Sequence, residues 1–418
     1  MIYTNRYESE VRTYCRKFPV TFNKAIGHKL YSIDDIIYID FFSGAGSLNY
    51  GHNHPGMKQS LLEYIQENGV TNTLDLSSQA KEGFIKEFQE KILLPRSMSY
   101  KMQFCNPTGT NAVESACKLA RKVTKLPKIV SFTNAFHGMT LGSLSLSGSK
   151  FIREGAGINL SNTYFMPYDK YYGKLINTLE NIEKMFLGSS NGYDSPAAFV
   201  VETIQGEGGL NVASDEWLLG LQRLARQLNA LLIVDDIQMG SGRTGRFFSF
   251  EHIPGFEPDI ICLSKSLSGM GLPLSLVMMK DYLDIWKPGE HNGTFRGSNH
   301  SFITARVAIN LWDDPKFVAS VDALSIYFKE LLESKFINND GLSPSLKGRG
   351  MALGLEWNDT SIARLVSQAC FDRRLILETC GSDDQVLKIF PPLTISKETL
   401  REGISILEDA INAVYEKL

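Results

Sequence analysis

Two apolar segments of the chain end in side chains that could do chemistry together. The run Leu231–Val234 leads into Asp235, and the run Ile260–Leu263 leads into Ser264 and Lys265. In open parallel sheets, ligands gather at the carboxyl ends of the strands. A carboxylate there could keep the ring nitrogen of a bound pyridine protonated. A desolvated lysine is a usable nucleophile toward a carbonyl carbon.

Each residue also has an ordinary interpretation. Asp235 could be a metal ligand or a helix cap. Most lysines lie at the surface with the charged end in water, and Lys265 could be one of them. The two residues stand 30 positions apart at the ends of two successive apolar runs, and this arrangement favours the catalytic interpretation.

A third segment could bind an anion. Thr108, Gly109 and Thr110 form a turn before an amphipathic helix, and the free backbone N–H groups at a helix start bind phosphate. The alternative is an ordinary N-cap, for which threonine is common. Phe136 offers a flat face against which a ring could stack, although a single phenylalanine is more often a core residue.

Composition narrows the class of partner. The 418 residues include 43 basic and 46 acidic side chains, a formal net charge of -3, which argues against nucleic acid or an anionic membrane as the main partner. The six cysteines are scattered, so neither a disulfide framework nor a zinc site is expected. The first residues lack the apolar stretch of a signal peptide, and no apolar run approaches the roughly 20 residues that span a bilayer. We expect a cytoplasmic enzyme with small-molecule substrates and no metal.

The order of apolar and amphipathic segments predicts an α/β fold. Buried strands are expected at 128–133, 198–203, 231–235, 260–264 and 274–280, with a helix over 216–230 between two of them. This alternation predicts a mainly parallel sheet with helices on both faces. After residue 310 the pattern changes to a helix over 316–335, a strand at 350–357, a helix, short strands at 375–378 and 386–390, and a closing helix from about 396. We therefore expect a large domain at 55–310 and a smaller α+β domain at 311–418, against which residues 1–54 pack.

Taken in order, these segments resemble the class III aminotransferases, enzymes of fold type I that use pyridoxal 5′-phosphate (PLP). The resemblance runs from about residue 10 to 415. Its motifs are Gly51-His52 with Pro55, Thr108-Gly109-Thr110, Phe136-His137-Gly138, Val201–Gly209, Asp235–Gln238, Ser264-Lys265 and Gly293-Thr294-Phe295. The implied fold is a mainly parallel central sheet with helices on both faces, plus a smaller α+β domain.

The resemblance implies roles for the matched residues. Lys265 would hold the cofactor as a Schiff base and then carry the proton between substrate and cofactor. Asp235 would pair with the ring nitrogen, and Gln238 would hydrogen-bond the phenolic oxygen. Phe136 would stack on the ring, with His137 beside it in the cofactor site.

The implied phosphate site is shared between two chains. Thr108, Gly109 and Thr110 would bind the phosphate from one subunit, and Thr294 would reach it from the neighbouring subunit. The resemblance therefore implies a homodimer, or a higher assembly, with shared active sites.

Departures from the family pattern bear on the substrate. Glu207 matches the gate carboxylate of the family, which in relatives pairs with an arginine when no glutamate is bound. Here Lys388 stands in place of that arginine. Arg296 stands where many relatives have glycine. Met139 and Ala45 replace an arginine and a tyrosine of other members. Together with these substitutions, five stretches resemble the diaminobutyrate–2-oxoglutarate branch found in ectoine biosynthesis: Glu10–Val20, Phe41–Pro55, Pro107–Glu114, Glu290–Gly297 and Lys388–Ile395. This resemblance implies amino transfer from L-glutamate to L-aspartate 4-semialdehyde. The alternatives are an ornithine or 4-aminobutyrate transaminase, or a PLP mutase or racemase on the same fold. A PLP-sensing regulator would need a DNA-binding segment that the sequence does not display.

Overall fold

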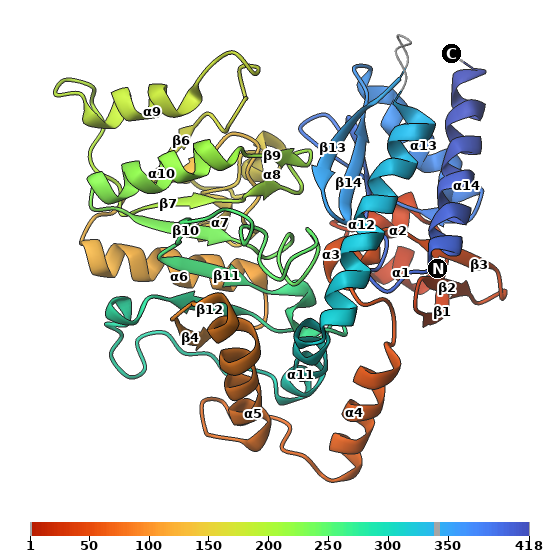
Figure 1. Cartoon of the computed structure of the whole chain (residues 1–418), viewed down its shortest axis with the longest axis horizontal. Coiled ribbons are helices and arrows are strands. Elements are labelled where there is room, and N and C mark those ends of the chain that lie inside the picture. The colour runs from red at the N-terminus through yellow and green to blue at the C-terminus, as the bar shows by residue number, and fades with distance from the viewer. Residues whose placement is uncertain (1, 338–342, 418) are drawn as a thin grey trace.

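The computed structural model describes residues 2–337 and 343–417, and its largest sheet has seven strands, on the left in Figure 1. Five neighbouring strands run parallel, whereas β12 is antiparallel to both strands beside it. The order is β4 (Lys101–Phe104), β12 (Leu276–Met279), β11 (Ile260–Leu263), β10 (Leu231–Asp235), β7 (Ala198–Val201), β5 (Ile129–Phe132) and β6 (Thr163–Met166). The sequence-based expectation of a mainly parallel sheet is confirmed.

Successive side chains of β10 explain why helices cover both faces of this sheet. Leu231 and Ile233 belong to an apolar cluster with helix α6 (Gly109–Thr124). Leu232 and Val234 belong to a second cluster with helix α10 (Asp215–Gln227). Because neighbouring side chains of a strand point to opposite faces, an all-apolar strand needs a helix on each side.

Strands β4 and β6 were not predicted from the sequence. Within the described part of the chain, each has one partner strand and therefore forms an edge of the sheet. Lys101 is exposed, and Thr163, Tyr164 and Phe165 are only partly buried or exposed. An edge strand that is covered incompletely lacks the continuous apolar run that marked the five central strands.

A second sheet, which is antiparallel, lies to the right of the seven-stranded sheet in Figure 1. Its order is β13 (Ser345–Arg349), β14 (Ala352–Glu356), β17 (Val386–Ile389) and β16 (Glu378–Cys380). Helix α13 (Thr360–Asp372) contacts strands of this sheet and the closing helix α14 (Lys397–Tyr415), which in turn packs on α12 (Pro315–Phe336). Ser396 caps α14, where the sequence predicted the helix start.

The first segment of the chain joins the last one. Strands β1 (Phe22–Ile26), β2 (Lys29–Ser32) and β3 (Ile37–Asp40) form a sheet whose fourth strand is β15 (Leu375–Ile376), parallel to β3. Ser43 donates a hydrogen bond to the carbonyl oxygen of Phe390, 347 residues further on. The structure thus brings residues before position 54 into contact with the C-terminal part of the chain.

One fully buried guanidinium ties three segments together. Arg243 donates to Asn49 Oδ1 at 2.7 and 3.0 Å, to the Met351 carbonyl at 3.2 Å and to the Pro391 carbonyl at 2.7 Å. Burial lowers the pKa of Arg243 to about 9. Such a buried cation needs these oxygens to replace its water, so it fixes the three segments relative to one another.

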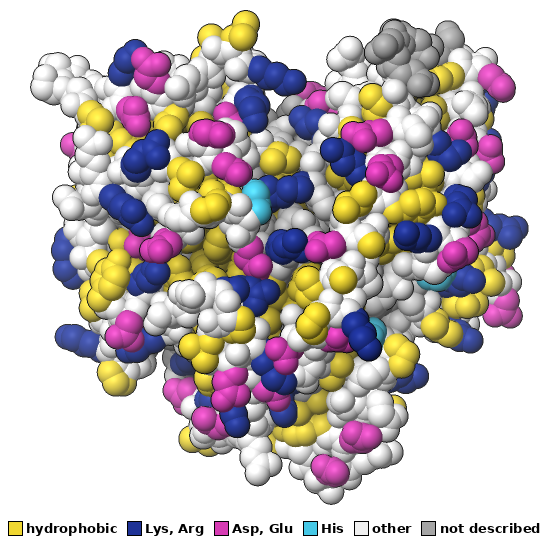
Figure 2. All heavy atoms as spheres, viewed as in Figure 1, with side chains coloured by type: hydrophobic (Ala, Val, Ile, Leu, Met, Phe, Trp, Pro, Cys, Tyr) yellow, Lys and Arg dark blue, Asp and Glu magenta, His cyan; other side chains and the backbone are white. Residues whose placement is uncertain are grey.

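The remaining α-helices and strands complete the fold, and the helix Asn299–Asp313 among them buries Phe302, Ile309 and Trp312 in the core. These elements are helices α1 (Ile2–Tyr7), α2 (Tyr14–Lys17), α3 (Ser43–Gly46), α4 (Pro55–Gln66), α5 (Gln79–Glu87), α7 (Leu141–Leu144), α8 (Lys150–Glu154), α9 (Thr178–Leu187) and α11 (Asn299–Asp313), and the hairpin strands β8 (Ile204–Gln205) and β9 (Asn211–Val212). Across the described ranges, no helix is both long and apolar enough to cross a membrane. Figure 2 shows basic and acidic side chains interspersed over one face of the molecule.

Candidate active site

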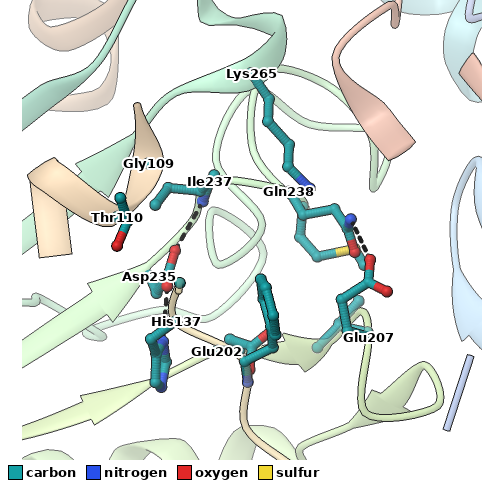
Figure 3. A pocket seen from close by; sticks show the side chains of 13 residues that line it. Gly109, Thr110, His137, Glu202, Glu207, Asp235, Ile237, Gln238 and Lys265 are labelled. Carbon is teal, nitrogen blue, oxygen red and sulfur yellow. Dashed lines mark hydrogen bonds and ion pairs between the residues drawn. The ribbon is translucent and has the colours of Figure 1, made fainter. Parts of the chain in front are cut away.

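A pocket lies where β10 and β11 end, as expected for an open parallel sheet. Eight residues singled out from the sequence line it: Gly109, Thr110, Phe136, His137, Glu207, Asp235, Gln238 and Lys265. Figure 3 shows that Lys265 extends into the pocket from one side, while Asp235 and His137 lie together on another. The structure therefore brings together residues that are up to 156 positions apart, from Gly109 to Lys265.

Asp235 is the last residue of β10 and is held by two neighbours. Its Oδ2 lies 2.7 Å from His137 Nδ1, and its Oδ1 accepts the Ile237 backbone N–H at 3.2 Å. Burial alone would lower the pKa of His137, but the hydrogen bond and charge of Asp235 outweigh burial and raise it. The carboxylate thus faces the pocket with a fixed orientation.

Lys265 opens a 3-10 helix (Lys265–Ser268) directly after β11. Its backbone φ is +50°, in the left-handed region that a non-glycine residue adopts at a cost, often at functional sites. Nζ donates to the carbonyl oxygen of Ala45 at 2.9 Å. Burial lowers the pKa of Lys265, although the nearby charge of Glu207 opposes this. A lowered pKa makes the neutral, nucleophilic amine more accessible.

The start of helix α6 provides the anion-binding end of the pocket. Gly109 and Thr110 are its first residues, and the first N–H groups of a helix have no acceptor within it. A Cβ on Gly109 would come within 3.0 Å of the Ile237 side chain. Thr110 Oγ1 hydrogen-bonds Thr140 Oγ1 at 2.6 Å. Thr108 differs from the expectation, because its side chain is exposed and donates to Asn111 rather than lining the pocket.

Gln238 lies between the lysine and the gate carboxylate. Its Nε2 donates to the Ala45 carbonyl at 3.0 Å and to Glu207 Oε1 at 2.8 Å. The side-chain oxygen Oε1 of Gln238 lies against Gly206 and accepts no hydrogen bond from the residues that the structure describes. Both N–H groups are thus already used, which differs from the expected hydrogen bond toward a ring oxygen.

Glu207, which lines the pocket, forms an ion pair with the buried Lys388. The distance from Lys388 Nζ to Glu207 Oε1 is 2.7 Å, and Lys388 is fully buried whereas the Glu207 side chain keeps 30% of its exposure. Burial alone would raise the pKa of Glu207, but the charges of Lys388 and Lys265 lower it to about 2. A second carboxylate, Glu378, lies 2.8 Å from the same Nζ.

Sequence reasoning missed Glu378 and Glu202. Glu378 ends the apolar run Leu375–Leu377, and Lys388 interrupts another apolar strand, so two opposite charges in neighbouring strands were a usable signal. Glu202 lines the pocket and accepts the backbone N–H groups of Phe136 and Gly206 at 3.0 and 3.3 Å. Burial raises its pKa to about 7.

Four other sequence-selected residues lie elsewhere or act differently. Thr294 is exposed and its carbonyl accepts from Asn72, and Arg296 donates to Asn292 Oδ1 at 3.3 Å beside a separate cavity. Neither lines the pocket of its own chain. Met139 is 59% exposed and is also outside the pocket lining. Ala45 contributes its backbone carbonyl, which accepts from both Lys265 and Gln238.

The pocket fits PLP on the chemistry of its donors. An amine, a carboxylate and a helix N-terminus surround one space, matching an aldehyde, a pyridine nitrogen and a phosphate. Phe136 and Ile237 add apolar surface for a flat ring. The fold and the site therefore define a PLP-dependent transferase of fold type I.

Comparison with known proteins identifies the family of PLP-dependent transferases to which the chain belongs. The family described as aminotransferase class-III matches residues 12–411, and the chain belongs to that family. It is 50% identical to the diaminobutyrate–2-oxoglutarate transaminase of Marinococcus halophilus over 98% of this chain and 96% of that protein. It is 51% identical to the enzyme of the same name from Vibrio cholerae over 96% of this chain and 97% of that protein. The ornithine aminotransferase structure from Toxoplasma gondii superposes with a TM-score of 0.84 at 27% identity, covering 99% of this chain and 94% of that chain.

Proposed function

We propose that this aminotransferase moves the amino group of L-glutamate to the aldehyde carbon of L-aspartate 4-semialdehyde, giving L-2,4-diaminobutyrate and 2-oxoglutarate. The identity of about half of all residues with transaminases of that name, over nearly the full chain, supports the substrate pair. The proposed setting is the cytoplasm.

The Glu207–Lys388 ion pair is the observation that carries the proposal. The two substrates place different groups next to Lys265, because the reacting carbon of glutamate bears a carboxylate and the reacting carbon of the semialdehyde bears none. Glu207 stays paired with Lys388 when the semialdehyde is bound, because its reacting carbon bears no carboxylate. Glutamate displaces Glu207 and binds Lys388 with its own α-carboxylate. One pocket can then accept both substrates.

The other pocket residues orient the cofactor and move protons. PLP supplies an electron-withdrawing ring and an aldehyde that condenses with amines. Lys265 Nζ would hold the cofactor through its aldehyde carbon, with release of water, and would carry the proton at the reacting carbon of the substrate. Asp235, oriented by His137, would keep a proton on the ring nitrogen, and the start of α6 would bind the phosphate at Gly109 and Thr110. Phe136 would cover one face of the ring and keep water away, and Thr108 would support the turn before the helix.

Gln238 would need to rearrange to serve the cofactor. If the phenolic oxygen of the ring takes one of its N–H groups, Gln238 releases either the Ala45 carbonyl or Glu207. If the Ala45 carbonyl is the acceptor released, the Gln238 amide would link the cofactor to Glu207.

We further propose that two chains share each site. Thr294 would complete the phosphate site from the partner subunit, and Arg296 would bind the distal carboxylate of the substrate from there. Their positions outside the pocket of their own chain, together with the exposed Phe295 between them, are compatible with a subunit interface.

Rates with different amino donors test the substrate assignment. Diaminobutyrate with 2-oxoglutarate should give the fastest reverse reaction, with the 4-amino group transferred. Ornithine, one methylene longer, should be slower by about 10-fold or more. Lys265→Ala serves as the inactive control. Equal rates with 4-aminobutyrate or ornithine would contradict the substrate but not the reaction class, and turnover without an added keto acid would point to a mutase.

A further inference from the structure

The buried ammonium of Lys388 lies between two carboxylates. Glu207 Oε1 is 2.7 Å and Glu378 Oε1 is 2.8 Å from Nζ. Glu207 lies on the turn between β8 and β9 and lines the pocket, whereas Glu378 is 3% exposed and lies behind it. Only Glu207 can therefore be displaced by a molecule that enters the pocket.

Sheet pairing fixes Glu378 opposite Lys388. The two residues are direct partners in the antiparallel pair β16–β17. Directly opposite side chains on one face of such a pair lie within about 5.5 Å at their Cβ atoms and stay neighbours as long as the sheet persists. No loop movement is needed to keep this pair together, in contrast to the pair with Glu207.

We propose that Glu378 is a positioning residue that keeps Lys388 charged and in place while Glu207 and the α-carboxylate of glutamate exchange on it. This inference rests on the proposed function. A buried lysine that lost its sole carboxylate would be a stranded charge, which proteins tolerate poorly. With Glu378 fixed beside it, Lys388 keeps a counter-ion during the exchange.

The electrostatics around Lys388 agree with this role. The titratable groups that act on it are Glu207, Glu378, Cys380, Tyr14 and Lys265. Burial would lower the pKa of Lys388, but the two carboxylates raise it well above its ordinary value. Burial raises the pKa of Glu378, Lys388 opposes this, and the charge of Glu207 adds to the rise. When Glu207 leaves, that repulsion disappears, so Glu378 ionises more readily when Lys388 has no other partner.

A double-mutant cycle on glutarate binding tests the role. Glutarate offers two carboxylates and no amine, and its dissociation constant for the PLP-loaded enzyme can be measured by calorimetry. Glu378→Gln alone should change this constant less than about threefold. The charge of Glu378 repels Glu207 in the free enzyme and glutarate in the complex to the same extent, so its loss affects both states equally. In the Glu207→Gln background, adding Glu378→Gln should tighten glutarate binding at least about tenfold, because glutarate then supplies the sole counter-ion of Lys388.

The pH dependence gives a second readout. In Glu207→Gln, Glu378 keeps Lys388 protonated, so glutarate binding should vary little with pH between about 7 and 9.5. In the double variant, burial lowers the pKa of Lys388, and binding should weaken as pH rises through that range. A side chain with a merely structural role would not produce this difference. Glu378→Gln effects of the same size in both backgrounds would overturn the proposal.

Matched controls separate the possible causes. Glu356, on β14 of the same sheet, pairs with Lys347 at 3.3 Å and is 29% exposed, so Glu356→Gln should leave glutarate binding unchanged in both backgrounds. If the Glu207→Gln, Glu378→Gln protein is unstable, adding Lys388→Met should restore its melting temperature, since the stranded cation is removed. Failure of that rescue would contradict the counter-ion role. If the wild-type enzyme binds no glutarate, the proposed donor is wrong, and the stability comparison still tests Glu378 without any substrate.

Discussion

At the scale of single residues, neighbours in the sequence have different tasks. Asp235 faces the pocket and contacts His137, whereas Asp236 accepts the Ser249 backbone N–H at 3.1 Å and is fully buried outside the pocket lining. Burial raises the pKa of Asp236 to about 7. The direction of a side chain at a strand end decides which of two adjacent aspartates can touch a ligand.

Asparagine substitutions distinguish the two aspartates. Asp235→Asn removes the charge that holds a proton on the ring nitrogen, and turnover should fall by about 10²-fold or more, within the range for the loss of one electrostatic contact. Asp236→Asn should change stability more than turnover. Steady-state rates and melting temperatures of the two PLP-loaded variants measure this. Loss of turnover in Asp236→Asn alone would reverse the assignment.

Glu202 should make stability depend on pH. Its folded pKa of about 7 exceeds the ordinary value of 4.5, so between these pH values the folded chain retains a proton that the unfolded chain has released. The contribution of Glu202 to the free energy of unfolding is therefore highest below pH 4.5. It declines by up to about 3 kcal/mol as pH rises to about 7. Glu202→Gln cannot titrate and should gain stability relative to wild type between pH 5 and 8.

Urea unfolding of both PLP-loaded proteins at pH 5 and pH 8 measures that shift. Exposed Glu67, at the end of α4, provides the control, and Glu67→Gln should follow wild type at both pH values. A stability difference between Glu202→Gln and wild type that is independent of pH would contradict the titration of Glu202.

At the scale of elements, continuous apolar segments could be predicted and edges could not. Strands β5, β7, β10 and β11 coincide with apolar runs, and β12 begins at Leu276 within its predicted run. The edge strands β4 and β6 bury fewer side chains, so their sequences contain no continuous apolar run. Asp235 and Lys265 were found because each stands at the end of an apolar run. The opposite charges of Glu378 and Lys388 were visible in the sequence, but their direct pairing depends on strand register, which the sequence does not display. The division at residues 54 and 310 stays a prediction.

The β8–β9 hairpin should be sensitive to a single methyl group. A Cβ on Gly206 would overlap Gln238 Oε1 and lie 2.9 Å from Met239 Cε. Gly206→Ala should therefore displace Gln238 and disturb its hydrogen bond to Glu207, raising KM for glutamate by about 10-fold or more, the effect of a misplaced site group. Gly56→Ala is the control, because its nearest contact would be an ordinary 3.5 Å. Equal KM values for the two variants would show that the hairpin adapts.

At the scale of the whole molecule, the family resemblance assigns Thr294 to the site of the neighbouring subunit, and Arg296, a departure from the family pattern, is a candidate for binding the distal carboxylate of the substrate. Thr294 and Arg296 lie outside the pocket lining of their own chain. Sites shared across a two-fold axis would account for this placement, since a symmetric interface repeats every contribution.

Mixed subunits test this sharing. Lys265→Ala chains are inactive but carry Thr294, and Thr294→Ala chains carry Lys265 with a weakened phosphate site. In a mixed dimer with shared sites, one site receives both intact residues and the other receives neither. Activity per Lys265-bearing chain should therefore rise when the two variants are unfolded and refolded together. Activity that is unchanged by mixing, with heterodimers verified by mass, would contradict sharing.

The joining of the first and last segments also bears on how the chain folds. Strand β3 can pair with β15 only after β15 has been synthesised. The Ser43 hydroxyl likewise donates to a carbonyl 347 residues later in the chain. These contacts therefore cannot form until synthesis is nearly complete. Arg243 likewise lacks two of its three acceptor segments until Met351 and Pro391 have emerged. Contacts of such long sequence separation slow folding and leave apolar surface uncovered during translation. The nascent chain should therefore depend on chaperones until its last strands are made, and C-terminal truncation should abolish folding of the N-terminal segment as well.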